Sequence, residues 1–434
     1  MLITLEHFIW IYLTIPLLLA VSLVFTFYLK GSQFQFKKML QFLSAKSPES
    51  NISPLGSLAF ALAARVGVGT LAGVALAIYL GGPGSIFWMW ASAFILAAAS
   101  FAESILAQIY KKRDHGVFVG GPAYYIQYGL KNRFFALSYA VMIIITYTLG
   151  FSAVQMNSIA TSFKQTLHVP PLITGIILAA ITALIILNGI SALAKLITKV
   201  VPLIAIFYIG IGPFAVLTNL NYLPVFFTTI LSDAFSPAPF LGGGLFLTFM
   251  TGIKRGVFAS EAGLGSGAHA AAITNDPTPI GQGYIQVFGI YLMTLVVVTI
   301  TAFLIMVTDT INLAPHLQGG IELTNFAMTA LFGETGSLLL TLAIFFFGFS
   351  TVLTAYFYGE VNLKFLTKNK KLLILLRLLV IMVVFISSII KPGIIWSLVD
   401  IGTGLTAIIN LVVILLLAQQ VKKVKNAHTN LKIS

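Results

Sequence analysis

The sequence contains no cysteine among its 434 residues, which excludes disulfide bonds and thiolate metal sites. Charge is also scarce, because Asp, Glu, Lys and Arg make up 9% of the chain, whereas soluble domains carry about 25%. Hydrophobic residues account for 58%, and the mean hydropathy is +1.00. A water-soluble chain of this length could not bury so much apolar surface, so the composition predicts an integral membrane protein.

Catalytic groups are few as well. The six histidines are scattered singly along the chain, without the spacing of metal ligands. No nucleophile lies beside a base at a membrane face, so we expect a protein that is not an enzyme and keep an integral-membrane enzyme as the weaker alternative. Four ionisable residues lie near or within apolar segments, where charge usually has a function and a partner. Arg65 and Glu103 are a candidate pair, and Glu261 and Glu360 are candidate caps of inner helix ends.

Eleven apolar segments follow one another, each of about 20 residues and long enough to cross a hydrocarbon core of roughly 30 Å. The predicted fold is therefore all-α, with eleven transmembrane helices. These segments span residues 8–29, 55–80, 85–109, 134–160, 171–188, 200–218, 238–258, 283–306, 336–358, 372–390 and 394–418.

Lysine and arginine gather in alternate connections, and only Lys164 and Lys391 fall on the other side. This asymmetry places the N-terminus outside and the C-terminus in the cytoplasm of a bacterial inner membrane. The net charge of +13 then reflects topology, and no nucleic-acid partner is expected. The alternate cations are Lys30, Lys37, Lys38, Lys46, Lys111, Lys112, Arg113, Lys131, Arg133, Lys195, Lys199, Lys254, Arg255, Lys364, Lys368, Lys370, Lys371, Arg377, Lys422, Lys423, Lys425 and Lys432.

The two long outer connections, 219–237 and 307–335, lack Lys and Arg, and we expect short amphipathic helices there. The first segment has no basic stretch before it, which favours a retained helix over a signal peptide.

Glycine is abundant in two places where it should weaken a helix. The second segment contains "GVGTLAG" at 67–73, and the seventh contains "GGG" at 242–244 and "GIKRG" at 252–256. These segments head two sets of five, and paired interruptions in corresponding positions indicate a transporter built from inverted repeats. Alternatives are close helix packing and a dinucleotide-binding turn. The second fails because no strand precedes the motif and no acidic residue follows about 20 residues later.

Residue counts put both interruptions near the bilayer midplane, with Arg255 at the inner surface. Unwound backbone at that depth costs several kcal/mol for each unpaired group. An amino acid and a cation would offset that cost, bound by helix N-termini, free carbonyls and hydroxyls. Candidate polar partners at this depth are Gln155, Asn157, Ser350, Thr351 and Thr354, although Ser and Thr also bond back to their own helix.

Several motifs together resemble the alanine/glycine:cation symporter family, also called sodium–alanine symporters. The resemblance covers nearly the whole chain and implies a LeuT-like fold, with an extra N-terminal helix before a five-plus-five inverted repeat whose helices 1 and 6 are broken. The matching stretches are "GVGTLAGVA" (67–75), "GGPGSIFWMWASAF" (81–94), "FAE" (101–103), "GGPAYYIQYGL" (120–130), "VQMNSIA" (154–160) and "GIKRGVFASEAGLGSGAHAAA" (252–272).

This resemblance implies Na⁺-driven, or H⁺-driven, uptake of a small neutral amino acid by a monomer. Four regions follow: the N-terminal helix and basic loop (1–54), the first repeat (55–218), the second repeat (219–418) and the basic tail (419–434). The substrate-binding residues implied are Thr70, Leu71, Gly73, Gln155, Gly243, Gly244, Phe246 and Phe249. Those implied to bind Na⁺ are Val66, Gly69, Ser350 and Thr351.

The chain departs from the family pattern at three points. Thr70 stands where the family usually has Asn, Ser260 replaces the Asn of "FSNEAG", and Thr354-Ala355 replaces a frequent Gly-Trp. A missing Trp beside the pocket would remove a large wall. We therefore expect a substrate larger than alanine, such as glutamine, or a different coupling ion. An uncoupled sensor or channel stays an alternative.

Overall fold

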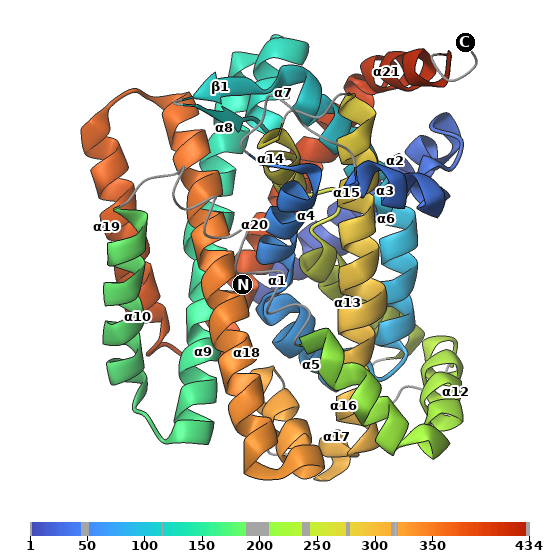
Figure 1. Cartoon of the computed structure of the whole chain (residues 1–434), viewed down its shortest axis with the longest axis vertical. Helices are drawn as coiled ribbons and strands as arrows, with labels where there is room; N and C mark the ends of the chain where they lie inside the picture. Colours follow the sequence, from blue (N-terminus) through green and yellow to red (C-terminus); the bar gives the residue numbers. More distant parts are fainter. Residues whose placement is uncertain are drawn as a thin grey trace.

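The computed structural model is almost entirely helical, with long helices that run side by side (Figure 1). It describes residues 2–44, 52–114, 116–187, 208–236, 244–274, 278–313, 317 and 320–430. For residues 428–430 it describes the backbone but not the side chains. Several positions named above therefore lie outside the described residues: Lys46, Lys195, Lys199, Gly242, Gly243 and Lys432.

The first half of the chain forms helices with one short hairpin. The bounds are α1 (Leu2–Phe8), η1 (Ile9–Thr14), α2 (Ile15–Tyr28), η2 (Ser32–Phe34), α3 (Phe36–Leu43), α4 (Pro54–Arg65), α5 (Val68–Gly81), α6 (Ser85–Tyr110), β1 (Lys112–Asp114), β2 (Val117–Val119), α7 (Pro122–Gly129), α8 (Arg133–Ile143), η3 (Ile144–Phe151), α9 (Ser152–Leu167), α10 (Pro171–Ile186) and a helix over Tyr208–Thr218.

The second half contains helices and no strand among its described residues. The bounds are η4 (Leu220–Tyr222), α12 (Leu223–Ala234), α13 (Gly244–Ser260), α14 (Ser266–Ala272), α15 (Pro279–Tyr291), η5 (Leu292–Val297), α16 (Val298–Val307), α17 (Thr310–Leu313), α18 (Ile321–Leu366), α19 (Lys370–Ser387), α20 (Pro392–Leu416) and α21 (Ala418–Asn430).

Six described helices, or continuous helix runs, are long and apolar enough to cross a membrane, and up to eight if each bent pair counts as one span. The eleven predicted segments exceed that number for identifiable reasons. Helix α10 has only 16 residues, α13 has 17, and α19 carries Lys370, Lys371 and Arg377 within its 18 residues. The shortness of α10 and α13 and the charge of α19 therefore account for the lower count within the described ranges.

The all-helical prediction is wrong at one small point, because β1 and β2 form an antiparallel hairpin. The expected helices in the two long outer connections are present as α12, α17 and the start of α18, which kinks at Gly333. Figure 1 shows α12 and α17 at one end of the molecule, and β1, α7 and α21 at the opposite end. The cations of β1 and of α21 lie at this second end.

The second predicted segment is broken, as its glycines indicate. Helices α4 and α5 meet at an angle of 43° across Val66 and Gly67. Val66 has a ψ of 76° and Gly67 has a φ of −136° with a ψ of −150°, so neither continues the helix. A side chain on Gly67 would meet Thr351 Oγ1 at 2.6 Å, which is why only glycine fits there.

The predicted interruption at "GIKRG" is wrong, because α13 runs unbroken through residues 252–256. Those glycines instead let α6 approach, since a Cβ on Gly252 would lie 2.5 Å from Trp88. The break comes later, between α13 and α14, where Glu261, Gly263 and Gly265 adopt the left-handed conformation with φ of 56°, 79° and 79°. Two of these three positions are glycine, the residue that enters this region without strain.

The two broken helices pack against each other in opposite directions. Helix α5 contacts α13, and α4 contacts α14, so the first half of one helix lies beside the second half of the other. This antiparallel pairing brings both breaks into the protein interior.

Lys254 and Arg255 do not lie at the end of a segment, which corrects their assignment to the inner surface. Arg255 is 2% exposed and forms an ion pair with Asp400. Lys254 Nζ lies 3.1 Å from Asp400 Oδ2 and 2.5 Å from Glu6 Oε1. Asp400 follows the first residue of α20 by eight positions, or about 12 Å of helix. We call these four side chains the neutral quartet, since two cations face two carboxylates.

The neutral quartet predicts unequal effects of removing its two carboxylates. Asp400→Asn leaves both cations without their shared acceptor, and breaking a buried ion pair costs about 3–5 kcal/mol. Glu6→Gln should cost less, because Lys254 keeps Asp400 as its partner. Thermal unfolding of the purified variants in detergent measures both losses. Equal midpoints for the two variants would contradict this account.

Candidate functional site

The break between α4 and α5 is held by a side chain from α9. Gln155 Oε1 accepts a hydrogen bond of 2.8 Å from the backbone N–H of Val68, the first residue of α5. It also lies 2.7 Å from where a Cβ of Gly67 would stand. The motif resemblance implies that Gln155 binds a substrate, and the structure places its side-chain oxygen on the N-terminus of α5.

Helix α18 reaches the other side of the same break. Thr351 Oγ1 donates to the carbonyl of Ala63 at 2.8 Å, and Ser350 Oγ lies 3.5 Å from that oxygen. Both hydroxyls also bond back to Phe347, one helical turn earlier. Ala63 was missed in the sequence because an alanine in an apolar run carries no signal of a free carbonyl. The only available hint was its position one turn before a helix break.

This geometry sets two opposite partial charges side by side. The carbonyls at the C-terminal end of α4 carry a partial negative charge, and the N–H groups at the start of α5 carry a partial positive one. Neutral carbonyl and hydroxyl oxygens suit an alkali cation, whereas exposed N–H groups suit a carboxylate. The residues present therefore fit Na⁺ beside Ala63, Ser350 and Thr351, and an anion beside Val68.

An aromatic wall closes the site from α13, η3 and α20. Phe258 lies 4.5 Å from Phe151 and 5.0 Å from Trp396, measured between ring centroids. A Cβ on Gly69 would stand 2.7 Å from the Phe258 ring, and one on Gly73 would stand 4.0 Å from Trp396. Three residues far apart in sequence form this wall, so no local pattern could have revealed it.

The other predicted residues of α5 are buried but engaged. Thr70 Oγ1 donates to the carbonyl of Gly67 at 3.1 Å, which closes the first turn of α5. The carbonyl of Leu71 accepts from Thr324 at 3.2 Å. Gly69 faces Phe258, whereas Ser350 and Thr351 approach Ala63.

The predicted residues at the start of α13 lie away from the break. Gly244 begins that helix with a φ of 68°, and Phe246 is 58% exposed. Phe249 packs edge-on against Trp88 at 4.8 Å between centroids. Phe246 precedes Glu261 by 15 residues, or about 22 Å along a helix. Because the second break lies at 261–265, Phe258 rather than Phe246 or Phe249 stands beside Gly69 at the start of α5.

Asn157 and Thr354 have structural partners. Asn157 donates to the carbonyls of Ser387 and Ile390 and so joins α9 to the end of α19. Thr354 Oγ1 donates to the carbonyl of Ser350 in its own helix, at 2.9 Å.

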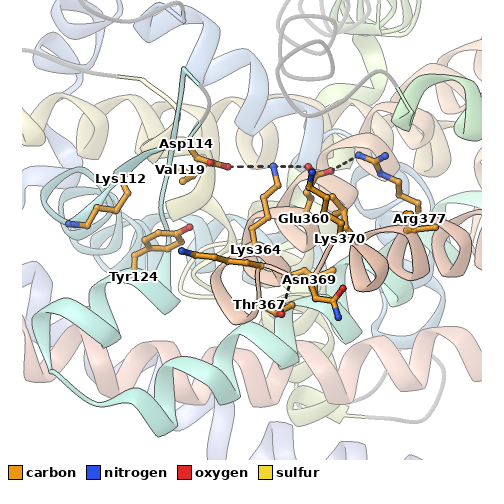
Figure 2. A pocket seen from close by; sticks show the side chains of 14 residues that line it. Lys112, Asp114, Val119, Tyr124, Glu360, Lys364, Thr367, Asn369, Lys370 and Arg377 are labelled. Atoms are coloured by element: carbon orange, nitrogen blue, oxygen red, sulfur yellow. Dashed lines mark hydrogen bonds and ion pairs between the residues drawn. The ribbon is translucent and has the colours of Figure 1, made fainter.

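A cavity of about 840 Å³ lies elsewhere, between the β-hairpin, α18 and α19 (Figure 2). A chain of ion pairs crosses it. Lys364 Nζ lies 3.4 Å from Asp114 Oδ2 and 3.0 Å from Glu360 Oε1, and Arg377 Nη2 lies 3.9 Å from Glu360 Oε2. Glu360 thus joins helices instead of capping one. Burial and the nearby carboxylate of Asp114 raise the pKa of Tyr124, which lines this cavity as a neutral phenol. The cavity lacks a broken helix, so we place the candidate site at Gly67.

Comparison with protein families gives a match over almost the whole chain. A model described as the sodium:alanine symporter family matches residues 1–433. The chain is 39% identical over 429 residues to the probable sodium/glutamine symporter GlnT of Bacillus subtilis, covering 98% of this chain and 89% of that protein. It is 35% identical over 431 residues to the sodium/alanine symporter AgcS of Methanococcus maripaludis, covering 96% and 94%.

Among solved structures, the fold is similar to that of a manganese transporter from Eremococcus coleocola. The TM-score is 0.54 over 85% of this chain and 78% of that one, at 12% sequence identity. This likeness concerns the fold alone.

The Gln155 contact predicts a local change in backbone protection. Gln155→Leu removes the acceptor of the Val68 N–H, so hydrogen exchange in the peptide that covers residues 66–71 should rise about 5- to 150-fold, since a lost buried hydrogen bond costs about 1–3 kcal/mol. Gln155→Glu retains an acceptor and should keep the protection. Asn157→Leu, on the same helix, is the matched control. Unchanged exchange in Gln155→Leu would rule out this capping role.

Proposed function

This chain belongs to the sodium:alanine symporter family, and from that premise we propose that it is a Na⁺-coupled symporter of a small neutral amino acid. The family consists of transporters, which are not enzymes, and its members are multi-pass membrane proteins. The observation that carries the proposal is the break at Gly67, where hydroxyls of α18 meet a free end of α4 beside the N-terminus of α5.

The proposed architecture has eleven transmembrane helices, with an extra N-terminal helix followed by two inverted repeats over 55–218 and 219–418. The antiparallel contact of α4–α5 with α13–α14 supports this symmetry. The basic tail, 419–434, and the basic end of α6 indicate a cytoplasmic C-terminus and an outer N-terminus. We place the protein in a bacterial inner membrane, where a monomer would suffice.

The proposed mechanism is alternating access. Na⁺ binds between the C-terminal end of α4 and the hydroxyls of Ser350 and Thr351, which fixes the bend at Gly67. The substrate carboxylate then binds the N–H groups at the start of α5, where it competes with Gln155. Na⁺ carries one positive charge inward, which a membrane potential favours by about 2.3 kcal/mol per 100 mV. Coupling requires that each ligand raises the affinity for the other.

The size of the substrate depends on the side chains that line the proposed pocket. Relatives are named for alanine in one case and glutamine in another, so the family does not decide the substrate. Ala355 stands where the family pattern often has Trp, and this smaller side chain supports a substrate larger than alanine. H⁺ is the alternative coupling ion, and an uncoupled sensor or channel is the second candidate.

The cation site predicts a loss of Na⁺ dependence. Ser350→Ala together with Thr351→Ala removes both hydroxyls at Ala63, so amino-acid uptake into proteoliposomes should no longer respond to a Na⁺ gradient. Thr354→Ala is the matched control, because that hydroxyl bonds only within α18 among the described residues. Na⁺-driven uptake that survives the double substitution would refute the site.

The pocket walls predict the order of competing substrates. Unlabelled glutamine should inhibit uptake of radiolabelled alanine by proteoliposomes, because no Trp follows Thr354. Ala355→Trp should reduce inhibition by glutamine more than inhibition by glycine. Strict selectivity of the unmodified protein for alanine and glycine would contradict the larger pocket.

A further inference from the structure

A second ionic cluster lies between α4, α6 and the break that follows α13. It consists of Arg65, Glu103 and Glu261, which are 1%, 0% and 1% exposed. One guanidinium faces two carboxylates, so the cluster has a formal charge of −1 when both acids are ionised. The neutral quartet described above has two charges of each sign. We call the new group the acidic triad.

Among the described residues, the side chains of the acidic triad form hydrogen bonds with groups outside the triad but not with one another. Arg65 Nη1 donates to the carbonyl of Gln286 at 3.1 Å. A Cβ on Gly267 would stand 2.8 Å from Arg65 Nη2 and 3.5 Å from Glu103 Oε1, so both groups border the same glycine. Arg65 interacts electrostatically with Glu261 and with Glu103. The triad therefore acts as one electrostatic unit.

Several polar atoms of this unit lack partners. Within the described residues, Arg65 Nε and Nη2, Glu103 Oε1, Glu261 Oε1 and the Tyr358 hydroxyl are buried without a hydrogen bond. Tyr358 comes from α18 and interacts with all three members of the triad. Unpaired polar atoms in a low dielectric are costly, and an unbalanced charge is costlier still.

Within the part of the chain that the structure describes, the groups around the triad supply no second positive charge. Tyr125, Tyr139, Tyr147 and Tyr358 face it from α7, α8, η3 and α18. His269 of α14 packs 4.9 Å from the Tyr358 ring. Its Nδ1 lies 3.3 Å from the carbonyl of Ser266 and its Nε2 lies 2.8 Å from Asn362 Nδ2, so one nitrogen donates and the other accepts. That pattern belongs to a neutral imidazole.

We propose that the acidic triad is a proton-binding site and that Glu261 carries the proton. Glu103 Oε2 accepts from the N–H of Gly265 at 3.1 Å and from Asn410 at 2.7 Å, two bonds that stabilise its ionised form. Glu261 Oε2 accepts only from Ser266, at 2.8 Å, among the described residues. A proton from water that binds Glu261 Oε1 brings the triad to neutrality and turns an unpaired acceptor into a donor.

A proton fits this place better than Na⁺ does. The Arg65 guanidinium in the same cluster repels a metal ion, whereas a proton forms a covalent O–H bond and leaves no second point charge. The Na⁺ site at Ala63 differs in this respect, since its ligands are neutral oxygens.

The position of Glu261 connects its proton to the moving parts of the proposed symporter, and this step rests on the proposed function. Glu261 lies in the second break, in a left-handed conformation that is strained for a residue other than glycine. Arg65 is the last residue of α4, directly before the first break. Loss of the proton restores a negative charge opposite Arg65 and draws the two breaks together. Proton binding would therefore bias the equilibrium between the outward-open and inward-open states.

Infrared spectroscopy of the purified full-length protein tests the proton directly, without substrate or Na⁺. The spectrum should contain the C=O band of a protonated carboxylic acid, which is lost as the pH rises. Glu261→Gln should abolish this band, and Glu261→Asp should retain one. Glu360→Gln, in the cavity of Figure 2, is the matched control and should keep the band.

Glu103→Gln gives an independent test if Glu261→Gln does not fold. It leaves one carboxylate for one guanidinium, so Glu261 should stay ionised and the band should again be absent. A band that persists in either glutamine variant, or the absence of a band from the unmodified protein, would overturn the proposal.

Uptake measurements distinguish a failure of the proton site from a failure of the proposed symporter function. An inside-alkaline pH gradient should change Na⁺-driven uptake at least threefold in the unmodified protein and leave it unchanged in Glu261→Gln. Failure of Na⁺-driven uptake in the unmodified protein would refute the symporter, and the infrared band would still decide the proton site. Equal responses to the pH gradient in both proteins would refute the coupling role of Glu261.

Discussion

Every backbone group in an apolar interior must find a partner within the protein, and the arrangement around the two breaks follows from that requirement. Val68 N–H is satisfied by Gln155 of α9, and the Ala63 carbonyl by Thr351 of α18. At the second break, the carbonyl of Gly263 accepts from Asn410 of α20, and that of Leu264 accepts from Tyr139 of α8. Neighbouring helices that are continuous at these contacts (α8, α9, α18 and α20) thus hold the two broken helices in place.

The same low dielectric sorts the buried charges into two kinds. The neutral quartet balances its charges and joins α1, α13 and α20. The acidic triad leaves one charge unbalanced and lies between the two breaks. A balanced cluster stabilises one arrangement, whereas an unbalanced one responds to a ligand that changes its charge.

The sequence predicted the first break, Gln155 and the two hydroxyls of α18, because glycine and isolated polar residues stand out in apolar segments. It missed the break at "SEAGLG" (260–265) and expected interruptions at 252–256, where α13 is unbroken, and at 242–244, of which the structure describes only Gly244. It also assigned Lys254 and Arg255 to a surface, because a count of cations cannot reveal acceptors such as Glu6 and Asp400 far away in the chain. The aromatic wall of Phe151, Phe258 and Trp396 could not be predicted either, because tertiary packing brings together residues that are far apart in sequence.

The ion pair between Glu6 and Lys254 also constrains how the protein is made. The two residues are 248 positions apart, and ribosomes add about 5–20 residues per second, so Glu6 is synthesised roughly 10–50 s before its partner. During that interval the first apolar helix must reside in or beside the bilayer with an acid that has no cation to pair with. The ion pair of Glu6 can therefore form only after α13, which carries Lys254, has been synthesised.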